Sequence, residues 1–235
     1  MPAAASLPPL LTRRFVALLL AQASFGFSFA SFFLLPKFVT TQLHGAPSEI
    51  GLVMAAFGVA SIVFIPLVGS WIDRLGRRPF VTAGGCVMFV AALGFLAVDR
   101  VGPLIYALRM LQGIGFSMAF ISMSTMVTDQ APRERLGQAI GVFGVSILSM
   151  HAVAPAIAEE VAERFGWSWV FVSAAVAAVL CIALSRGLEE RPLATHEATG
   201  AGLIEVALRP RSLRIIAVVA LTGAAFGVMM TYPQP

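Results

Sequence analysis

The dominant pattern in this chain is an alternation of long apolar runs with short polar connectors. Each run has about the 20 residues that a helix needs to cross the core of a bilayer. Six runs are complete and a seventh closes the chain, so the pattern predicts an all-α integral membrane protein. The predicted spans are residues 14–36, 48–70, 80–98, 103–126, 136–158, 167–186 and 214–232.

One connector is much longer than the others, and it divides the chain. Residues 187–213 are polar, with Glu189 and Glu190 near their start. No other connector is long enough to separate two domains. We therefore expect an N-terminal six-helix transmembrane bundle over 1–186, a cytoplasmic linker over 187–213, and a seventh transmembrane helix over 214–235 that starts a further bundle.

The composition changes this picture little, but it excludes other classes. Apolar residues make up 58% of the 235 residues and charged residues only 12%, and the mean hydropathy is +0.88. A soluble domain does not keep so few charges. The net charge of +4 suggests nucleic acid as a partner, but the basic residues lie in separate short loops. We therefore expect a lipid bilayer as partner and no nucleic acid.

Enzymatic and metal chemistry find no support in the sequence. Cys86 and Cys181 lie inside apolar runs, which predicts neither a disulfide nor a metal site. His44, His151 and His196 lie in different regions and form no metal-binding pattern. The chain has no G-x-x-x-x-G-K-[ST] phosphate loop, no H-E-x-x-H and no G-x-S-x-G. We therefore expect a protein that is not an enzyme, uses no ATP and holds no cofactor.

The basic residues predict the orientation in the membrane, because cytoplasmic loops are enriched in lysine and arginine. With the N-terminus inside, three basic residues lie outside (Lys37, Arg100 and Arg164), and Arg109 lies within a span. The other 12 of the 16 are cytoplasmic: Arg13, Arg14, Arg74, Arg77, Arg78, Arg133, Arg135, Arg186, Arg191, Arg209, Arg211 and Arg214. The prediction is a multi-pass protein of the plasma or inner membrane with a cytoplasmic N-terminus.

The densest polar segment is Gly69-Ser-Trp-Ile-Asp-Arg-Leu-Gly-Arg-Arg78, between the second and third runs. We interpret it as a tight cytoplasmic turn between two membrane helices. Gly76 suits a backbone that reverses within a few residues. Orientation alone accounts for the arginines but requires neither Asp73 nor Gly76.

Three further stretches have a recognisable order along the chain. They are Arg109-Met-Leu-Gln-Gly113-Ile-Gly115 in the fourth span, Ala131-Pro-Arg-Glu-Arg-Leu-Gly137 before the fifth, and Phe165-Gly-Trp-Ser-Trp-Val-Phe171 at the start of the sixth. Together with the segment 69–78, they resemble motifs of the major facilitator superfamily of secondary transporters. The resemblance covers essentially the whole chain.

The resemblance implies a six-helix bundle built from two inverted three-helix repeats, and transport of a small-molecule substrate by alternating access, coupled to protons. It also implies that residues 69–78 form a gating latch against a second bundle. The gating residues are Gly69, Asp73, Arg74, Gly76, Arg77 and Arg78.

Two departures from the family pattern qualify this expectation. The position of the antiporter G-P-x-x-G-G motif reads Ala154-Pro155-Ala-Ile-Ala158-Glu159, and span one carries no acidic residue. A complete member has two bundles, so we expect a fragment of a longer transporter with a missing C-terminal half. The alternative is a half-transporter that pairs with a second copy.

Arg109 is the most informative single residue, because an arginine inside a span is costly unless it is paired or hydrated. It lies six residues past Pro103, ~9 Å from the outer end of the span, within reach of the headgroups by snorkelling. The presence of Gln112 and Gly113 one turn later favours a position in the bundle interior instead. By resemblance, these three residues take part in substrate binding or proton coupling.

Further polar residues in spans one, four and five are candidates for a central cavity. They are Gln22, Ser24, Ser28, Ser117 and His151. Small residues also let membrane helices approach closely, which is the alternative role for the serines. For His151 a structural role is favoured over proton transfer, because no acidic residue lies within one turn of it.

The sequence therefore predicts a secondary transporter of a small solute. Efflux is only slightly favoured over uptake, and proton coupling is implied by the resemblance alone. The alternative is a non-transporting membrane receptor or assembly subunit.

Overall fold

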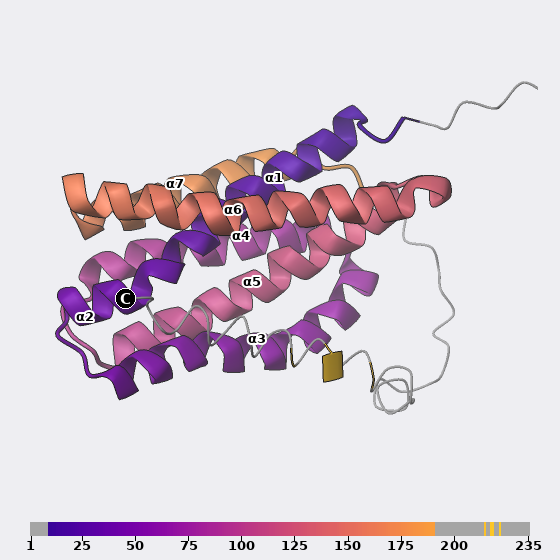
Figure 1. The fold of residues 1–235 in the computed structure, drawn as a ribbon. Helices are drawn as coiled ribbons and strands as arrows, with labels where there is room; N and C mark the ends of the chain where they lie inside the picture. The colour runs from indigo at the N-terminus through magenta and orange to yellow at the C-terminus, as the bar shows by residue number, and fades with distance from the viewer. Residues whose placement is uncertain (1–8, 191–213, 215–216, 219–220, 222–235) are drawn as a thin grey trace, which may run out of the picture. The chain divides into compact units, whose positions relative to one another are not determined.

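The protein is described here by a computed structural model, which places residues 9–190, 214, 217–218 and 221 (Figure 1). The expected linker over 187–213 and seventh span over 214–235 lie almost entirely outside these residues. The described bundle is helical throughout. Its elements are α1 (Arg13–Ala30), η1 (Ser31–Leu34), α2 (Leu35–Thr41), α3 (Pro47–Leu75), α4 (Arg78–Gly94), η2 (Phe95–Ala97), α5 (Pro103–Gln130), η3 (Arg133–Arg135), α6 (Leu136–Phe165) and α7 (Trp167–Ser185).

The helices form six segments that are long and apolar enough to cross a membrane, among the described residues. The first is the continuous run Arg13–Thr41, made by α1, η1 and α2. All six agree with the spans predicted from the sequence, but several are longer. Helix α3 continues to Leu75 and α6 to Phe165, past the predicted ends at 70 and 158. Hydropathy marks where the bilayer ends, whereas a helix continues until its backbone is capped or broken.

Local backbone chemistry sets the helix ends. Thr12 caps α1, its side chain accepting a hydrogen bond from the N–H of Phe15. Helices α3 and α6 both end at a glycine with positive φ, Gly76 at 89° and Gly166 at 91°. We call the end of the bundle with the start of α1 and the Gly76 turn the Gly76 end. The opposite end, with loops 42–46 and 98–102, is the Gly166 end.

The packing of the helices follows an internal repeat. Helix α5 packs against α3 and α4, while α1 packs against α6 and α7; α4 also packs against α7, and α1 against α5. Exchanging spans one to three for spans four to six leaves these contacts unchanged, although α6 and α7 pack together more closely than the corresponding α3 and α4. Because successive spans are antiparallel, the two sets of three run in opposite directions (Figure 1). The bundle is therefore two inverted three-helix repeats, as the resemblance to the superfamily implied.

Glycines allow the closest helix contacts in the bundle. A Cβ atom on Gly84 would lie 2.6 Å from the carbonyl oxygen of Gly115 and 2.7 Å from the backbone N of Ala119. Helices α4 and α5 thus touch backbone to backbone, the arrangement that small residues permit in membrane helices.

Helices α3 and α6 are the least covered by the rest of the bundle. In the most apolar stretch of α3, 17% of the residues are buried, and in that of α6, 11%. The corresponding share in the first span is 61%. Their exposed side chains are mostly aliphatic, among them Leu52, Val59 and Ile62 on α3, and Val145 and Leu148 on α6. The two corresponding helices of the repeats therefore both present apolar surface outward.

Candidate functional site

Arg109 lies in the bundle interior with 3% of its surface exposed. Its Nη1 donates to the Oε1 of Gln112 at 2.8 Å, and its Nε points to the carbonyl oxygen of Val53 on α3 at 3.4 Å. Its Nη2 lies 3.8 Å from the Sδ of Met54, and the guanidinium sits 4.9 Å from the centre of the Phe57 ring. The side chain is turned toward α3, so it does not snorkel to the headgroups.

All of these partners of Arg109 are electrically neutral. No carboxylate pairs with the guanidinium in the described part of the chain. A charged group within a membrane span is normally paired or marks a substrate or ion pathway. The interior of this bundle thus contains a positive charge that the described residues solvate but do not neutralise.

Gln112 leaves one hydrogen-bonding group unused beside this charge. The residue is 1% exposed, and its Oε1 is taken by Arg109. Its Nε2 has no partner among the described residues. A buried donor without a partner costs about 1–3 kcal/mol, which is recovered when a bound molecule or water supplies an acceptor.

Gly113 has a packing contact that explains its presence without a chemical role. A Cβ atom there would lie 2.5 Å from the carbonyl oxygen of Phe57 and 2.9 Å from the Cβ of Ala60. Ser117, one turn later, donates to the carbonyl oxygen of Gly113 at 2.8 Å. The absence of a side chain at Gly113 lets α5 lie directly against α3, next to Arg109.

An aromatic cluster continues from the Arg109 site across the bundle. The Phe29 ring lies 5.3 Å from that of Phe57, 4.7 Å from that of Phe116, and 6.0 Å from His151. Phe33 meets His151 at 5.1 Å. Phe29 is buried, whereas the other four rings are half-exposed. Spans one, two, four and five thus share a partly open aromatic face, with Arg109 at one edge.

The remaining cavity candidates of span one are not joined to this site. Gln22 and Ser28 are buried, and the Gln22 Oε1 and the Ser28 Oγ have no partner among the described residues. Ser24 is half-buried and donates to the carbonyl oxygen of Leu20. No hydrogen bond between described residues connects the three to Arg109.

Phe57 and Phe116 are among the members of this site that the sequence analysis did not single out. A signal existed for Phe116, which lies seven residues after Arg109 and therefore on the same face of α5. Phe57 had no such signal, because a phenylalanine in an apolar run resembles any lipid-facing residue.

The Gly76 segment differs from the prediction in one respect. Residues 69–75, expected as part of a turn, are the last turns of α3, and the chain reverses only at Gly76 and Arg77. No residue before Gly76 breaks the helix, so polarity alone did not end it. The expected glycine reversal is confirmed by the positive φ of Gly76.

The charged residues of this segment fall into two groups. Arg77 is mostly buried and pairs with Asp129 at the end of α5, with 3.0 Å between Nε and Oδ2. Asp73, Arg74 and Arg78 are exposed at the surface of the Gly76 end. Gly69 makes no contact that requires a glycine, because a Cβ atom there would meet nothing within 4 Å. One arginine thus fixes the turn to the bundle, while the other charges remain accessible.

The geometry defines a multi-pass helical membrane protein whose interior holds a solvated but unneutralised arginine beside an aromatic face. Residues 16–234 match the family model described as Major Facilitator Superfamily. The chain belongs to this superfamily of membrane transporters.

Several relatives of the chain are drug-resistance proteins. Multidrug resistance protein 1 of Bacillus subtilis (strain 168) is 24% identical over 158 residues, which are 66% of this chain and 40% of that protein. The chloramphenicol resistance protein of Pseudomonas aeruginosa is 32% identical over 139 residues, 57% of this chain and 32% of that protein. The match thus spans well under two thirds of either relative.

Solved structures show the same fold. The peptide-family transporter PepTSo gives a TM-score of 0.66 at 18% identity, over 77% of this chain and 39% of that one. The inward-open xylose transporter XylE from E. coli gives 0.63 at 17% identity, over 88% of this chain and 55% of that one. At these identities the likeness supports the fold alone.

Proposed function

We propose that this chain forms half of a secondary transporter that moves a small solute across the membrane by alternating access. The observation that carries the proposal is the buried guanidinium of Arg109, which is bonded only to neutral partners among the described residues. Keeping a charged side chain inside a membrane bundle costs several kcal/mol. A bound anionic group or a transported substrate offsets this cost.

The substrate class we propose is an aromatic or otherwise lipophilic compound with a polar or anionic group. The half-exposed rings of Phe57 and Phe116 supply the apolar contact. Arg109 and the unused Nε2 of Gln112 supply hydrogen-bond donors. The drug-resistance names of the relatives favour efflux over uptake.

A second six-helix bundle completes the transport path in this proposal. The exposed apolar faces of α3 and α6 are the surfaces on which it packs, and the accessible Asp73, Arg74 and Arg78 are the groups that contact it when the gate closes. A longer polypeptide or a second copy of this chain supplies this bundle.

Coupling to protons is the least supported part of the proposal. No aspartate or glutamate lies in the middle of a described span, so this half offers no carboxylate as proton carrier. Proton coupling therefore depends on His151 or on groups of the second bundle. Abolishing the proton gradient in the assay below tests it directly.

The substitution that tests the function is Arg109→Ala. The assay uses cells that express the gene from which this chain comes. The rate of efflux of chloramphenicol or of a lipophilic dye is expected to fall at least about tenfold, which corresponds to about 1.4 kcal/mol of activation free energy. The protein level in the membrane is expected to stay unchanged, because removing a buried charge does not impede insertion.

The matched control is Arg164→Ala, which removes an exposed arginine paired only with Glu160 four residues earlier. It is expected to leave transport unchanged. Normal efflux by Arg109→Ala would disprove the assigned role. If the intact protein moved no solute at all, the receptor or assembly-subunit alternative would replace transport.

A further inference from the structure

Arg109 has more hydrogen-bond donors than the bundle gives it acceptors. A guanidinium has five N–H donors. Its described contacts are with the Oε1 of Gln112, the carbonyl oxygen of Val53 and the Sδ of Met54. The last of these is a thioether sulfur, which is a weak acceptor. Five donors for three acceptors leave two N–H groups without a partner in the described part of the chain.

The orientation of the Gln112 amide is fixed by Arg109. Because a guanidinium only donates, the amide must turn its Oε1 toward the Nη1, at 2.8 Å. Its Nε2 then remains a donor with no partner among the described residues. The oxygen and nitrogen of an amide lie about 2.2 Å apart, so the Nε2 is within about 5 Å of the Nη1. Donors of two side chains are thus close enough to share one small acceptor.

These donors are buried, but they border the partly open aromatic face. Arg109 is 3% exposed and Gln112 is 1% exposed. Met54 and Phe57, which contact the guanidinium, are half-exposed. Helices α3 and α5 are in direct contact one turn further on, at Gly113. The space beside the donors therefore suits a small group that enters past Met54 and Phe57.

Charge decides which small group fits best. A water molecule accepts hydrogen bonds but leaves the guanidinium charge uncompensated, whereas an anion accepts the same bonds and neutralises the charge. A buried charge without a counter-charge is costly. No aspartate or glutamate lies in the middle of a described span to supply one. A cation is excluded, because Arg109 repels it.

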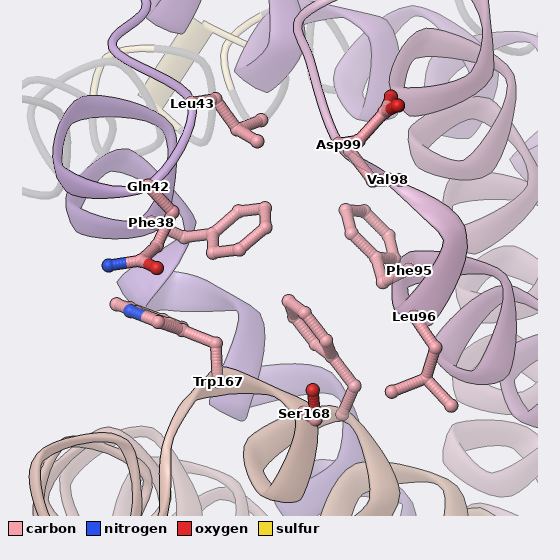
Figure 2. Close-up of a pocket in the computed structure, with 10 residues that line it drawn as sticks. Phe38, Gln42, Leu43, Phe95, Leu96, Val98, Asp99, Trp167 and Ser168 are labelled. Atoms are coloured by element: carbon pink, nitrogen blue, oxygen red, sulfur yellow. The ribbon is translucent and has the colours of Figure 1, made fainter.

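A cavity of about 270 Å³ at the Gly166 end has the opposite character (Figure 2). Asp99 is the one charged residue among those described around it, and its carboxylate repels anions. Phe38, Phe95 and Phe171 are buried against one another there and offer no hydrogen-bond donor. An anion is therefore expected at the Arg109 site and not in this cavity.

We propose that Arg109 and Gln112 bind a small monovalent inorganic anion, such as chloride, between the donors of their two side chains. The ion neutralises the bundle interior and is distinct from the organic solute. The inference deepens the proposed function, because it concerns the same site. Binding of the ion is nevertheless measured without transport.

Chloride binding is measured as thermal stabilisation. The protein expressed from the gene from which this chain comes is purified in detergent in sodium gluconate, and gluconate is replaced by chloride at constant ionic strength. An ion that binds the folded state stabilises it, so the melting temperature is expected to rise by a few degrees. Salts also stabilise proteins without binding to a site. A rise that the site variants share with the unchanged protein would therefore overturn the proposal.

The matched pair Gln112→Glu and Gln42→Glu tests the site. Gln112→Glu replaces the Nε2 donor by a carboxylate oxygen that itself neutralises Arg109, so the chloride response is expected to disappear. In gluconate this variant is expected to melt no lower than the unchanged protein. Gln42→Glu makes the same change at an exposed position and is expected to keep the full response. Equal responses of the two variants would contradict the inference.

Arg109→Met is the second site variant, in case Gln112→Glu does not fold. It removes the charge and keeps an unbranched side chain. Its chloride response is also expected to disappear. An unchanged response in Arg109→Met would refute the site.

Benzoate in place of chloride separates a free inorganic ion from an anionic group of the organic solute. Stabilisation by chloride that depends on Gln112 supports the inference, whether or not efflux is detected. Stabilisation by benzoate and not by chloride would assign the anionic group to the solute and disprove the inorganic ion. No response to either would also disprove it, while a loss of efflux in Arg109→Ala would still support transport.

Discussion

Arg109 and Gly113 lie one turn apart on α5 and contribute to the protein in different ways. Arg109 is placed by contacts with neutral groups of α3, so its charge remains available to a ligand. Gly113 is placed by having no side chain, which lets α3 come close enough to make those contacts. The contacts of Arg109 with α3 therefore depend on the absence of a side chain at Gly113.

Gly113→Ala is expected to destabilise the bundle by about 1–3 kcal/mol, the usual cost of overpacking a tight contact. The new methyl group would meet the Phe57 carbonyl oxygen at 2.5 Å, and backbone cannot move aside cheaply. Thermal unfolding in detergent measures the effect.

Gly58→Ala is the control, because a Cβ atom there meets nothing within 4 Å. It should be neutral or stabilising by up to about 1 kcal/mol, since alanine is the better helix former. Equal destabilisation by both substitutions would show that the α3–α5 contact is looser than described.

At the level of single residues, the sequence allowed a partial prediction of the site. The interior position of Arg109 was expected from Gln112 and Gly113, which would serve no purpose beside a snorkelling arginine. The packing role of Gly113 was not expected, because the spacing of residues along the sequence does not show which helix lies opposite a glycine. The same limit applies to Gln22 and Ser28, whose buried positions give them no contact with Arg109.

At the level of elements, the helix junctions depend on backbone geometry more than on polarity. Residues 70–75, which include Asp73 and Arg74, remain helical until Gly76, and residues 159–165 remain helical until Gly166. Both glycines have φ near 90°, which other residues adopt at a cost. Hydropathy placed the six described spans, but the glycines determine where α3 and α6 end.

The two junctions allow a matched test, Gly76→Ala against Gly166→Ala. Both substitutions strain a backbone with φ near 90° and ψ near 165°, a region essentially accessible only to glycine, by about 1–3 kcal/mol. Only at Gly76 does the added Cβ atom also meet a neighbour, the Glu190 Oε1 at 2.8 Å. Gly76→Ala is therefore expected to lower the melting temperature more.

The additional loss of stability caused by Gly76→Ala, compared with Gly166→Ala, should disappear when the side chain of Glu190 is truncated. Adding Glu190→Ala to Gly76→Ala removes the clash, so the double variant is expected to be more stable than the sum of the single effects, a coupling that a double-mutant cycle measures. Additive effects would mean that Glu190, which also accepts a hydrogen bond from the Arg78 N–H at 2.5 Å, does not pack on the turn.

At the level of the whole molecule, the repeat relates the positions of the helices. Helices α1 and α5 occupy corresponding central positions, and α3 and α6 corresponding outer ones. The number of spans and their alternation followed from hydropathy. Which helices touch did not, because lipid-facing and helix-facing apolar residues look alike in a sequence.

The predicted orientation is testable by cysteine labelling. In a background with Cys86→Ala and Cys181→Ala, Arg100→Cys marks the Gly166 end and Arg133→Cys the Gly76 end, and both positions are exposed. A membrane-impermeant maleimide added to intact cells is expected to label position 100 and not position 133, because most basic residues favour the cytoplasmic side. The reverse labelling would invert the predicted topology.

The contact pattern of α1 has a consequence for how the protein is made. Synthesis proceeds from the N-terminus, so α1 enters the membrane before the other helices of this bundle. Its main packing partners are α7, α6 and α5, which are synthesised later. Helix α1 therefore lies in the membrane, with its buried Gln22 and Ser28 lacking their final neighbours, until α5, α6 and α7 have been made in turn. The packing of α1 is complete only when α7, the last helix of the bundle, is in place.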